Sequence, residues 1–231
     1  MSSATTTREE TAHALLRTHG RTYASEAGIR MRDTPKPLYQ LLVLTSLLSA
    51  PIRAGVAVDA ARALYDAGMS TPHRMREATW QQRVDALGRG HYRRYDESTA
   101  TTLGTGAEFV GERCGGDLRR LREEADGDRD RMRRLLREAP GLGPTGADIF
   151  LREVQGVWPE FRPHLDTKAT QGAERLGLPS DPAHLAKLVD GEDLARFAAA
   201  LVRAALDRSV ADSVEAARTA PTASGSGHGG G

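Results

Sequence analysis

Residues 139–144, Ala-Pro-Gly-Leu-Gly-Pro, form a stretch that could bind a phosphate. Its prolines and glycines end one predicted helix, and a second predicted helix begins at about Thr145. The free N–H groups at the start of a helix, together with the helix dipole, make a site for an anion. The backbone amides around Gly141, Gly143 and Thr145 are therefore a candidate phosphate site, although Pro144 supplies no donor. An ordinary turn between two helices is the alternative interpretation.

A second stretch, His164-Leu165-Asp166-Thr167-Lys168, follows some twenty residues later. Asp166 directly precedes a predicted helix, which is typical of an N-cap. The intervening helix and loop could also return Asp166 toward the glycine turn. A carboxylate beside nucleic-acid phosphates makes sense where it faces positive charge that develops on a sugar.

The elements that position these residues are predicted to be helices. Alanine, leucine, arginine and glutamate dominate, valine and isoleucine are sparse, and alternating stretches are absent. This composition favours an all-α fold of about ten helices with short connections. The most apolar stretch, 38–50, predicts a central buried helix that Pro51 ends. Further helices are expected over 54–67, from Pro72, over 80–87, 96–113 and 145–155, and after Asp166, Asp181 and Asp190.

Composition excludes several classes of protein. The 231 residues carry a formal net charge of +1, so there is no global field for nucleic acid, and any basic face must be local. The single cysteine, Cys114, excludes a disulfide framework, a zinc ribbon and a cysteine-ligated iron–sulfur cluster within one chain. The histidines show no metal-ligand spacing. The longest apolar stretch is too short to span a bilayer and the amino terminus lacks a signal-peptide core, so we expect a cytoplasmic protein without a membrane partner.

Lysine is rare in this chain. Only Lys36, Lys168 and Lys187 are lysines, and every other basic residue besides histidine is arginine. The distinction bears on mechanism, because an arginine side chain cannot act as an amine nucleophile.

Three short strings together give the chain a family resemblance. They are Leu47-Leu48-Ser49-Ala50, the 139–143 turn and Leu165-Asp166-Thr167, in that order. With them, the chain resembles the helix-hairpin-helix DNA glycosylase superfamily, endonuclease III type, over roughly residues 38–207. The resemblance implies two helical domains flanking a DNA-binding cleft. These are a six-helix domain over 38–150 that ends in the hairpin, and a domain of residues 1–37 and 151–210 that carries the catalytic aspartate. The Gly/Ser-rich composition near the end predicts a disordered tail over 211–231.

The resemblance also implies an activity and a set of site residues. The activity is hydrolysis of the N-glycosidic bond of a damaged or mispaired base in double-stranded DNA, as in base-excision repair, by a monomer. Asp166 matches the catalytic aspartate. The hairpin residues match those that hold a DNA phosphate, in that family often with a monovalent cation. They are Gly141, Leu142, Gly143, Thr145 and Gly146.

Departures from the family pattern narrow these expectations. Thr145 stands where bifunctional members carry a lysine, so we expect a monofunctional enzyme without lysine-dependent AP lyase activity. Lys168 is expected to point away if a helix starts at Thr167, and so not to replace that amine. Pro51 stands where a polar residue often probes the opposite strand. The carboxyl-terminal cysteine cluster is absent, which implies no iron–sulfur cofactor.

A basic stretch at residues 89–95 is a further candidate for DNA contact. Arg93 and Arg94 could meet phosphates, and His91 or Tyr92 could stack in the space left by a flipped base. An exposed basic turn with its tyrosines packed at the edge is the alternative. For the chain as a whole, two other functions remain as alternatives. One is a helix-hairpin-helix DNA-binding protein that has lost catalysis, and the other is a helical interaction protein.

Overall fold

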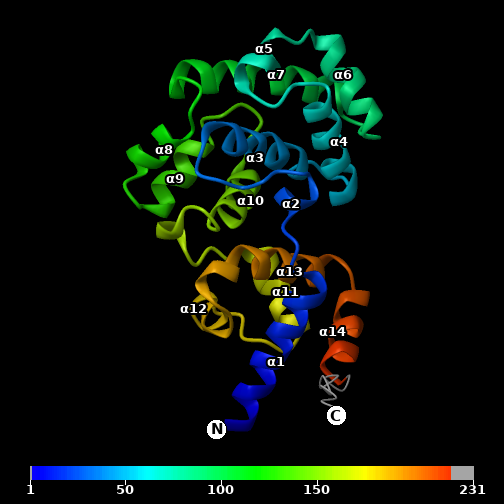
Figure 1. Ribbon diagram of the computed structural model, residues 1–231, viewed down its shortest axis with the longest axis vertical. Coiled ribbons are helices and arrows are strands. Elements are labelled where there is room, and N and C mark those ends of the chain that lie inside the picture. The colour runs from blue at the N-terminus through cyan, green and yellow to red at the C-terminus, as the bar shows by residue number, and fades with distance from the viewer. Residues whose placement is uncertain (1, 220–231) are drawn as a thin grey trace, which may run out of the picture.

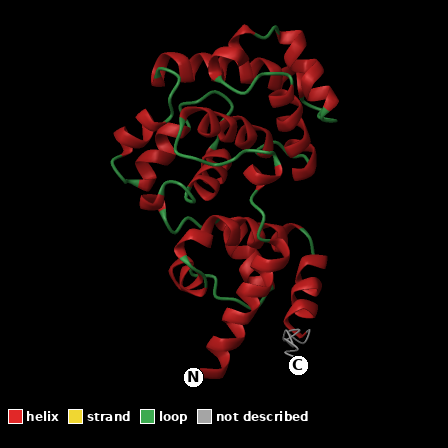
Figure 2. Ribbon diagram, in the orientation of Figure 1, coloured by secondary structure: helices red, strands yellow, loops and turns green. Residues whose placement is uncertain are grey.

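The computed structural model describes residues 2–219, and this part of the chain is helical with no strand (Figures 1 and 2). The α-helices are α1 (Ser2–His19), α2 (Tyr23–Glu26), α3 (Pro35–Leu48), α4 (Ala54–Asp66), α5 (Pro72–Glu77), α6 (Trp80–Arg89), α7 (Asp96–Cys114), α8 (Arg119–Ala125), α9 (Arg129–Leu136), α10 (Pro144–Val154), α11 (Thr167–Arg175), α12 (Pro182–Leu185), α13 (Leu194–Leu206) and α14 (Ser209–Thr219). Three short 3₁₀ helices, η1 (Pro159–Phe161), η2 (Ala186–Leu188) and η3 (Gly191–Asp193), complete the list. The all-α prediction is confirmed.

Helix α3 lies at the centre of the upper part of the molecule in Figure 1, which also contains α4–α10. Pro35 is its first residue, a position where the missing N–H costs nothing. Leu38, Leu41 and Leu44 are completely buried, and α3 packs against α4 and α10. The helix ends at Leu48, two residues before the predicted end, so Pro51 lies beyond it.

The lower part of the molecule in Figure 1 contains α1 and α11–α14, so the first and the last described helices lie there. Helices α11 and α13 approach very closely. A Cβ on Gly172 would lie 1.8 Å from the carbonyl oxygen of Leu201, so only glycine fits at this crossing. Helix α1 packs against α13 and α14, which brings the first residues of the chain beside the last described ones.

The predicted start of the disordered tail is wrong, because helix α14 occupies its first residues. A disordered tail was expected from residue 211, but α14 extends from Ser209 to Thr219. Val210 and Val214 are buried, and α14 contacts α1 and α13. The apolar contacts of these two valines explain why the segment is helical despite the polar composition that follows it. Residues 220–231, the remainder of the predicted tail, lie outside the described residues.

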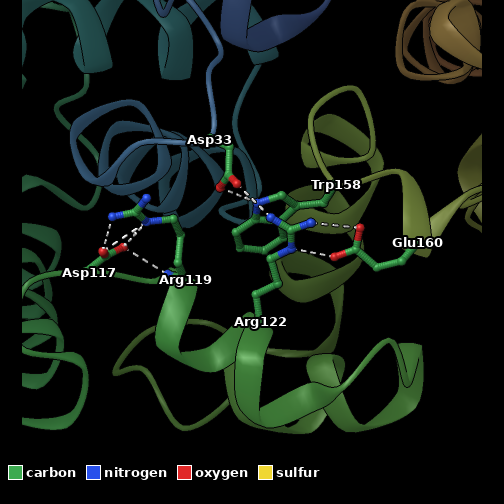
Figure 3. A network of polar contacts seen from close by, with 6 residues as sticks. All are labelled: Asp33, Asp117, Arg119, Arg122, Trp158 and Glu160. Carbon is green, nitrogen blue, oxygen red and sulfur yellow. Dashed lines mark hydrogen bonds and ion pairs between the residues drawn. The ribbon is translucent and has the colours of Figure 1, made fainter.

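A charged network joins three segments that are far apart in sequence (Figure 3). Arg122 on α8 makes ion pairs with Asp33, before α3, at 2.7 Å and with Glu160, in η1, at 2.5 Å. The indole Nε1 of Trp158 donates to Asp33 Oδ1 at 2.8 Å, and the Arg122 guanidinium lies over the Trp158 ring. Trp158 and Phe161 are fully buried. The two aromatic side chains therefore belong to the core, and the network secures the loop that follows α10.

Candidate active site

Asp166 is the N-cap of α11, as its position in the sequence predicts. One carboxylate oxygen, Oδ1, accepts a hydrogen bond from the Ala169 N–H at 2.9 Å. The other, Oδ2, lies 2.5 Å from Nη1 of Arg152 on α10. The Asp166 side chain is 9% exposed and that of Arg152 4% exposed. Both oxygens thus have partners on different elements, and the carboxylate is held in one orientation.

This carboxylate lines a cleft of about 430 Å³ between the two parts of the molecule. The walls come from the end of α3, the start of α4, and helices α10, α11 and α13, with Tyr23 of α2. One part is apolar and includes Leu206, which is 60% exposed. The rest is polar, with side chains from Thr145, Asp148, Arg152, Asp166, Lys168 and Gln171. An apolar cleft with a few convergent polar groups is the usual form of a ligand site.

The predicted hairpin is formed by α9, the connecting turn and α10. Gly141 has φ +77°, and a Cβ there would lie 2.1 Å from Cγ2 of Thr102, so the turn requires glycine at this position. Leu142 is buried and fixes the turn against the core, and its N–H donates to the Ala139 carbonyl at 3.1 Å, so its amide is not free to bind a phosphate. Gly143 caps α10 without a side chain, and Pro144 is the first helical residue. The next amides, of Thr145 and Gly146, therefore have no partner within the helix.

Thr145 connects the hairpin to Asp166, because both line the same cleft. The fold thus brings the first turn of α10 and the candidate carboxylate to one opening, as the length of the intervening helix and loop suggested, whereas Gly141 and Gly143 do not line it. Gly141, Gly143 and Thr145 are exposed, whereas Gly146 is buried.

Asp148 is a second carboxylate in the cleft, and sequence reasoning missed it. Its carboxylate is held by Arg133 of α9, with Nε 2.8 Å from Oδ1 and Nη2 3.0 Å from Oδ2. His164 Nε2 lies 3.4 Å from Asp148 Oδ1. Burial raises the pKa of Asp148. His164 and Arg133 together lower it by a larger amount, so the pKa lies below its ordinary value. The side chain is therefore ionised at neutral pH.

The loop before Asp166 is fixed by two hydrogen bonds to Gln155. The Gln155 Nε2 donates to the His164 carbonyl at 2.9 Å, and the His164 N–H donates to Gln155 Oε1 at 2.9 Å. Gln155 is completely buried. These bonds hold the chain next to α10, which is how Asp166 reaches Arg152.

Arg152 belongs to a buried cluster of charged and aromatic side chains, which also contains Tyr23, Glu153 and Arg203. Its guanidinium lies 5.9 Å from the centre of the Tyr23 ring, and Arg203 of α13 lies 4.5 Å from the same centre. Glu153 accepts the Ala24 N–H at 2.9 Å, and burial raises the pKa of this carboxyl group. Helix α2, in the amino-terminal segment, is therefore part of the cleft wall. No local signal in the sequence marks this cluster, because its members come from three distant segments.

The prediction that Lys168 points away from the site is wrong. Helix α11 does start at Thr167, yet Lys168 lines the cleft and does not point away from it. The side chain is exposed, and Nζ donates to Gln171 Oε1 at 3.0 Å. Since α11 begins at the margin of the cleft, its first turn lies along the opening.

The predicted basic loop is placed between α6 and α7, and none of its residues lines the cleft. Tyr92 is 2% exposed, and its hydroxyl accepts a hydrogen bond from Thr99 at 3.2 Å. The suggestion that Tyr92 stacks in the duplex is therefore wrong for this conformation, because its ring packs in the core. His91, with φ +63°, and the two arginines, Arg93 and Arg94, are exposed and stay candidates for DNA contact.

Residues 2–219 contain no helix long and apolar enough to cross a membrane. The same part of the chain holds no group of three or more histidine, cysteine or acidic residues placed to bind a metal ion.

Known proteins were compared with the chain by sequence and by structure. No family model matches it, and no curated protein matches it by sequence. Two solved structures are similar in fold. A trapped endonuclease III–DNA covalent intermediate, in an estranged-adenine complex, has a TM-score of 0.53 at 16% identity, over 88% of this chain and 85% of that one. A non-covalent endonuclease III–DNA complex has a TM-score of 0.52 at 15% identity, over 83% of this chain and 81% of that one. The chain therefore has the all-α, helix-hairpin-helix fold of endonuclease III.

Proposed function

We propose that this protein is a DNA glycosylase that releases a damaged or mispaired base from double-stranded DNA, in base-excision repair. The observation that carries the proposal is that Asp166 and the hairpin residue Thr145 line one cleft. The chain shares its fold with endonuclease III, and both similar solved structures are complexes of that protein with DNA, which supports the proposal. We further propose that the protein acts as a monomer.

The first role in this proposal is that of the hairpin. The backbone amides of the exposed residues Gly141, Gly143 and Thr145 can donate hydrogen bonds to a DNA phosphate, aided by the dipole of α10. Backbone carbonyls in the turn are also suitable ligands for the monovalent cation that the family resemblance implies, and no step depends on that ion. A phosphate held here would place the neighbouring nucleotide at the cleft.

The second role is that of Asp166. A nucleotide rotated out of the stack would enter the cleft with its sugar near this carboxylate. As the N-glycosidic bond breaks, positive charge develops on the sugar, and a fixed negative charge nearby stabilises it. Arg152 and the Ala169 N–H hold the carboxylate, so it need not reorganise during the reaction. Base release in this scheme is hydrolytic, because Thr145 offers no amine and water is the nucleophile.

A DNA-binding protein without catalysis is the second candidate. The observation in its favour is the Arg152–Asp166 ion pair, which partly neutralises the charge that the glycosylase needs. Against it, the carboxylate lines an open cleft, where a protein that only binds DNA gains nothing from an acid that faces phosphates.

The two candidates are separated by an excision screen. Duplexes carrying uracil, oxidised, alkylated or mispaired bases are incubated with the protein, and abasic product is revealed by alkaline cleavage. The proposal expects product from at least one duplex. Salt-dependent binding with no product from any duplex would favour the binding protein. No retention on DNA even at low salt would exclude both.

A further inference from the structure

Asp148 is a carboxylate in the cleft that the proposed mechanism leaves without a role. Thr145, Asp148, Ile149 and Arg152 follow one another on α10 at spacings of three, one and three residues, so they form one face of the helix, and all four line the cleft. Asp148 therefore lies one turn from Thr145 and one turn from Arg152, which holds Asp166. The group proposed to face the sugar and a second acid thus border the same opening.

The Asp148 carboxylate is more open to a ligand than that of Asp166. The Asp148 side chain is 24% exposed, against 9% for Asp166. Its Oδ1 lies 2.8 Å from Arg133 Nε and 3.4 Å from His164 Nε2, and its Oδ2 lies 3.0 Å from Arg133 Nη2. Each carboxylate oxygen can accept about two hydrogen bonds. Among the described residues no second donor contacts Oδ2, so this oxygen can accept one more hydrogen bond.

The ionisation of Asp148 determines which chemical group it can bind. Because His164 and Arg133 lower the pKa of Asp148, the carboxylate is charged at neutral pH and can only accept hydrogen bonds. The exocyclic amino group of cytosine or adenine is a donor, whereas the carbonyl group at the same position of a thymine-type base is an acceptor. A fixed carboxylate attracts the amino group and repels the carbonyl oxygen.

We propose that Asp148 selects the base that is released, by accepting a hydrogen bond on Oδ2 from an amino group at C4 of a pyrimidine or C6 of a purine. The inference rests on the glycosylase function proposed above, and it names the class of base that the cleft takes. The apolar side chains of the cleft, Leu48, Ile52 and Ile149 among them, suit the unpolar faces of the base ring. Selection then depends on one edge of the base and not on the size of its ring.

Asp148→Asn should reverse the preference. The Oδ1 position faces both Arg133 Nε and His164 Nε2, whereas the Oδ2 position faces Arg133 Nη2 alone. The oxygen of the amide is therefore better placed at Oδ1, which puts its NH₂ group at Oδ2. At that position the NH₂ group donates to a carbonyl oxygen and no longer accepts from an amino group.

The test compares bases that carry either an amino group or a carbonyl at the decisive position. The pairs are 5-hydroxycytosine with 5-hydroxyuracil and adenine with hypoxanthine, each opposite guanine in the same duplex, and kcat/KM for base release is measured for each. The proteins are the wild type, Asp148→Asn and the matched control Asp130→Asn. Asp130 also lies near Arg133, at 3.8 Å from its Nη1, but it is 78% exposed and does not line the cleft.

The ratio of the two kcat/KM values within a pair is the quantity that decides. Both values come from one preparation, so the folded fraction of a less stable variant cancels in the ratio. We expect the wild type to favour the amino base by about tenfold or more, since a site built to bind a donor rejects the analogue that lacks it. The ratio should fall by about tenfold or more in Asp148→Asn and stay unchanged in Asp130→Asn.

A wild-type ratio close to one would overturn the inference, and so would equal losses for both bases in folded Asp148→Asn. Comparison of the proteins removes any difference in how readily the two bases leave without an enzyme. Release of other bases in the excision screen, with none of the amino bases released, removes the selectivity and leaves the glycosylase. No release from any duplex removes both proposals.

Discussion

The guanidinium of Arg152 lies 2.5 Å from the carboxylate of Asp166, and both side chains are almost completely removed from solvent. Two helices that border the cleft, α10 and α11, are joined through this pair. A buried ion pair contributes little net stability, but loss of one partner leaves an uncompensated charge in the interior. The pair therefore links the integrity of the fold to the orientation of the candidate catalytic group.

Substitution of Arg152 should destabilise the protein strongly. Arg152→Met removes the cation and leaves the Asp166 carboxylate buried, which costs about 3–5 kcal/mol of the free energy of unfolding. The matched control is Arg74→Met, which removes an exposed ion pair with Glu77 and should cost less than about 1 kcal/mol. Urea denaturation measures both. Equal small losses in the two variants would show that the buried pair is not formed in solution.

Substitution by alanine should change the stability of the protein by different amounts at the two hairpin glycines, Gly141 and Gly143. Gly141→Ala puts a Cβ at φ +77° and 2.1 Å from Thr102 Cγ2, so we expect at least about 1–2 kcal/mol of destabilisation and weaker DNA binding. Gly143→Ala meets no atom within 4 Å and has φ −78°, so its loss of stability should be smaller, about 1 kcal/mol or less from the weaker capping of α10 by alanine.

A second substitution separates the two causes at Gly141. Thr102→Ser removes the clashing methyl group and should restore part of the stability of Gly141→Ala, leaving the cost of the left-handed backbone. If Gly141→Ala is as stable as the wild type, the turn does not adopt this conformation. Thermal melting and fluorescence anisotropy on duplex DNA provide the two readouts.

The charge on Asp148 predicts a pH dependence of stability. Burial raises the pKa of this carboxyl group, but the hydrogen bonds and charges of His164 and Arg133 outweigh it, and the pKa in the folded protein lies below its ordinary value. The stabilisation from this group is therefore present above about pH 4, the pKa expected for an unfolded chain, and is lost as the pH falls through the lower folded-state pKa.

Asp148→Asn tests this dependence. The variant should be less stable than the wild type at pH 7, and the difference should shrink as the pH is lowered from 5 toward 3. Urea midpoints across that range give the comparison. A difference that stays constant with pH would show that the loss comes from packing and not from the charge.

Local signals made much of the fold predictable. Helices were expected from Pro72, after Asp181 and after Asp166, and in the structure they begin there, with Thr71, Asp181 and Asp166 as their N-caps. Such starts are predictable because capping depends on residues adjacent in sequence. The glycine turn was recognisable for the same reason.

Contacts between distant segments were not predictable from local patterns. The pairing of Arg152 with Asp166 depends on how Gln155 fixes the loop, and the placement of Asp148 depends on Arg133 and His164. Lys168 shows the limit most clearly. The helix boundary was right, but the direction of the first turn relative to the cleft is set by the packing of α11 on α13.

The central claim is that Asp166 provides the negative charge that drives base release. The most direct measurement is the single-turnover rate of base release by Asp166→Asn, on the duplex that the wild type processes best. The control is Asp181→Asn, since Asp181 is also an N-cap that accepts the N–H three residues ahead, away from the cleft. Circular dichroism and DNA affinity establish that both variants fold and bind. We predict a loss of about 10²–10³-fold or more in Asp166→Asn with DNA binding retained, and an unchanged rate in Asp181→Asn. A wild-type rate in folded Asp166→Asn would contradict the account.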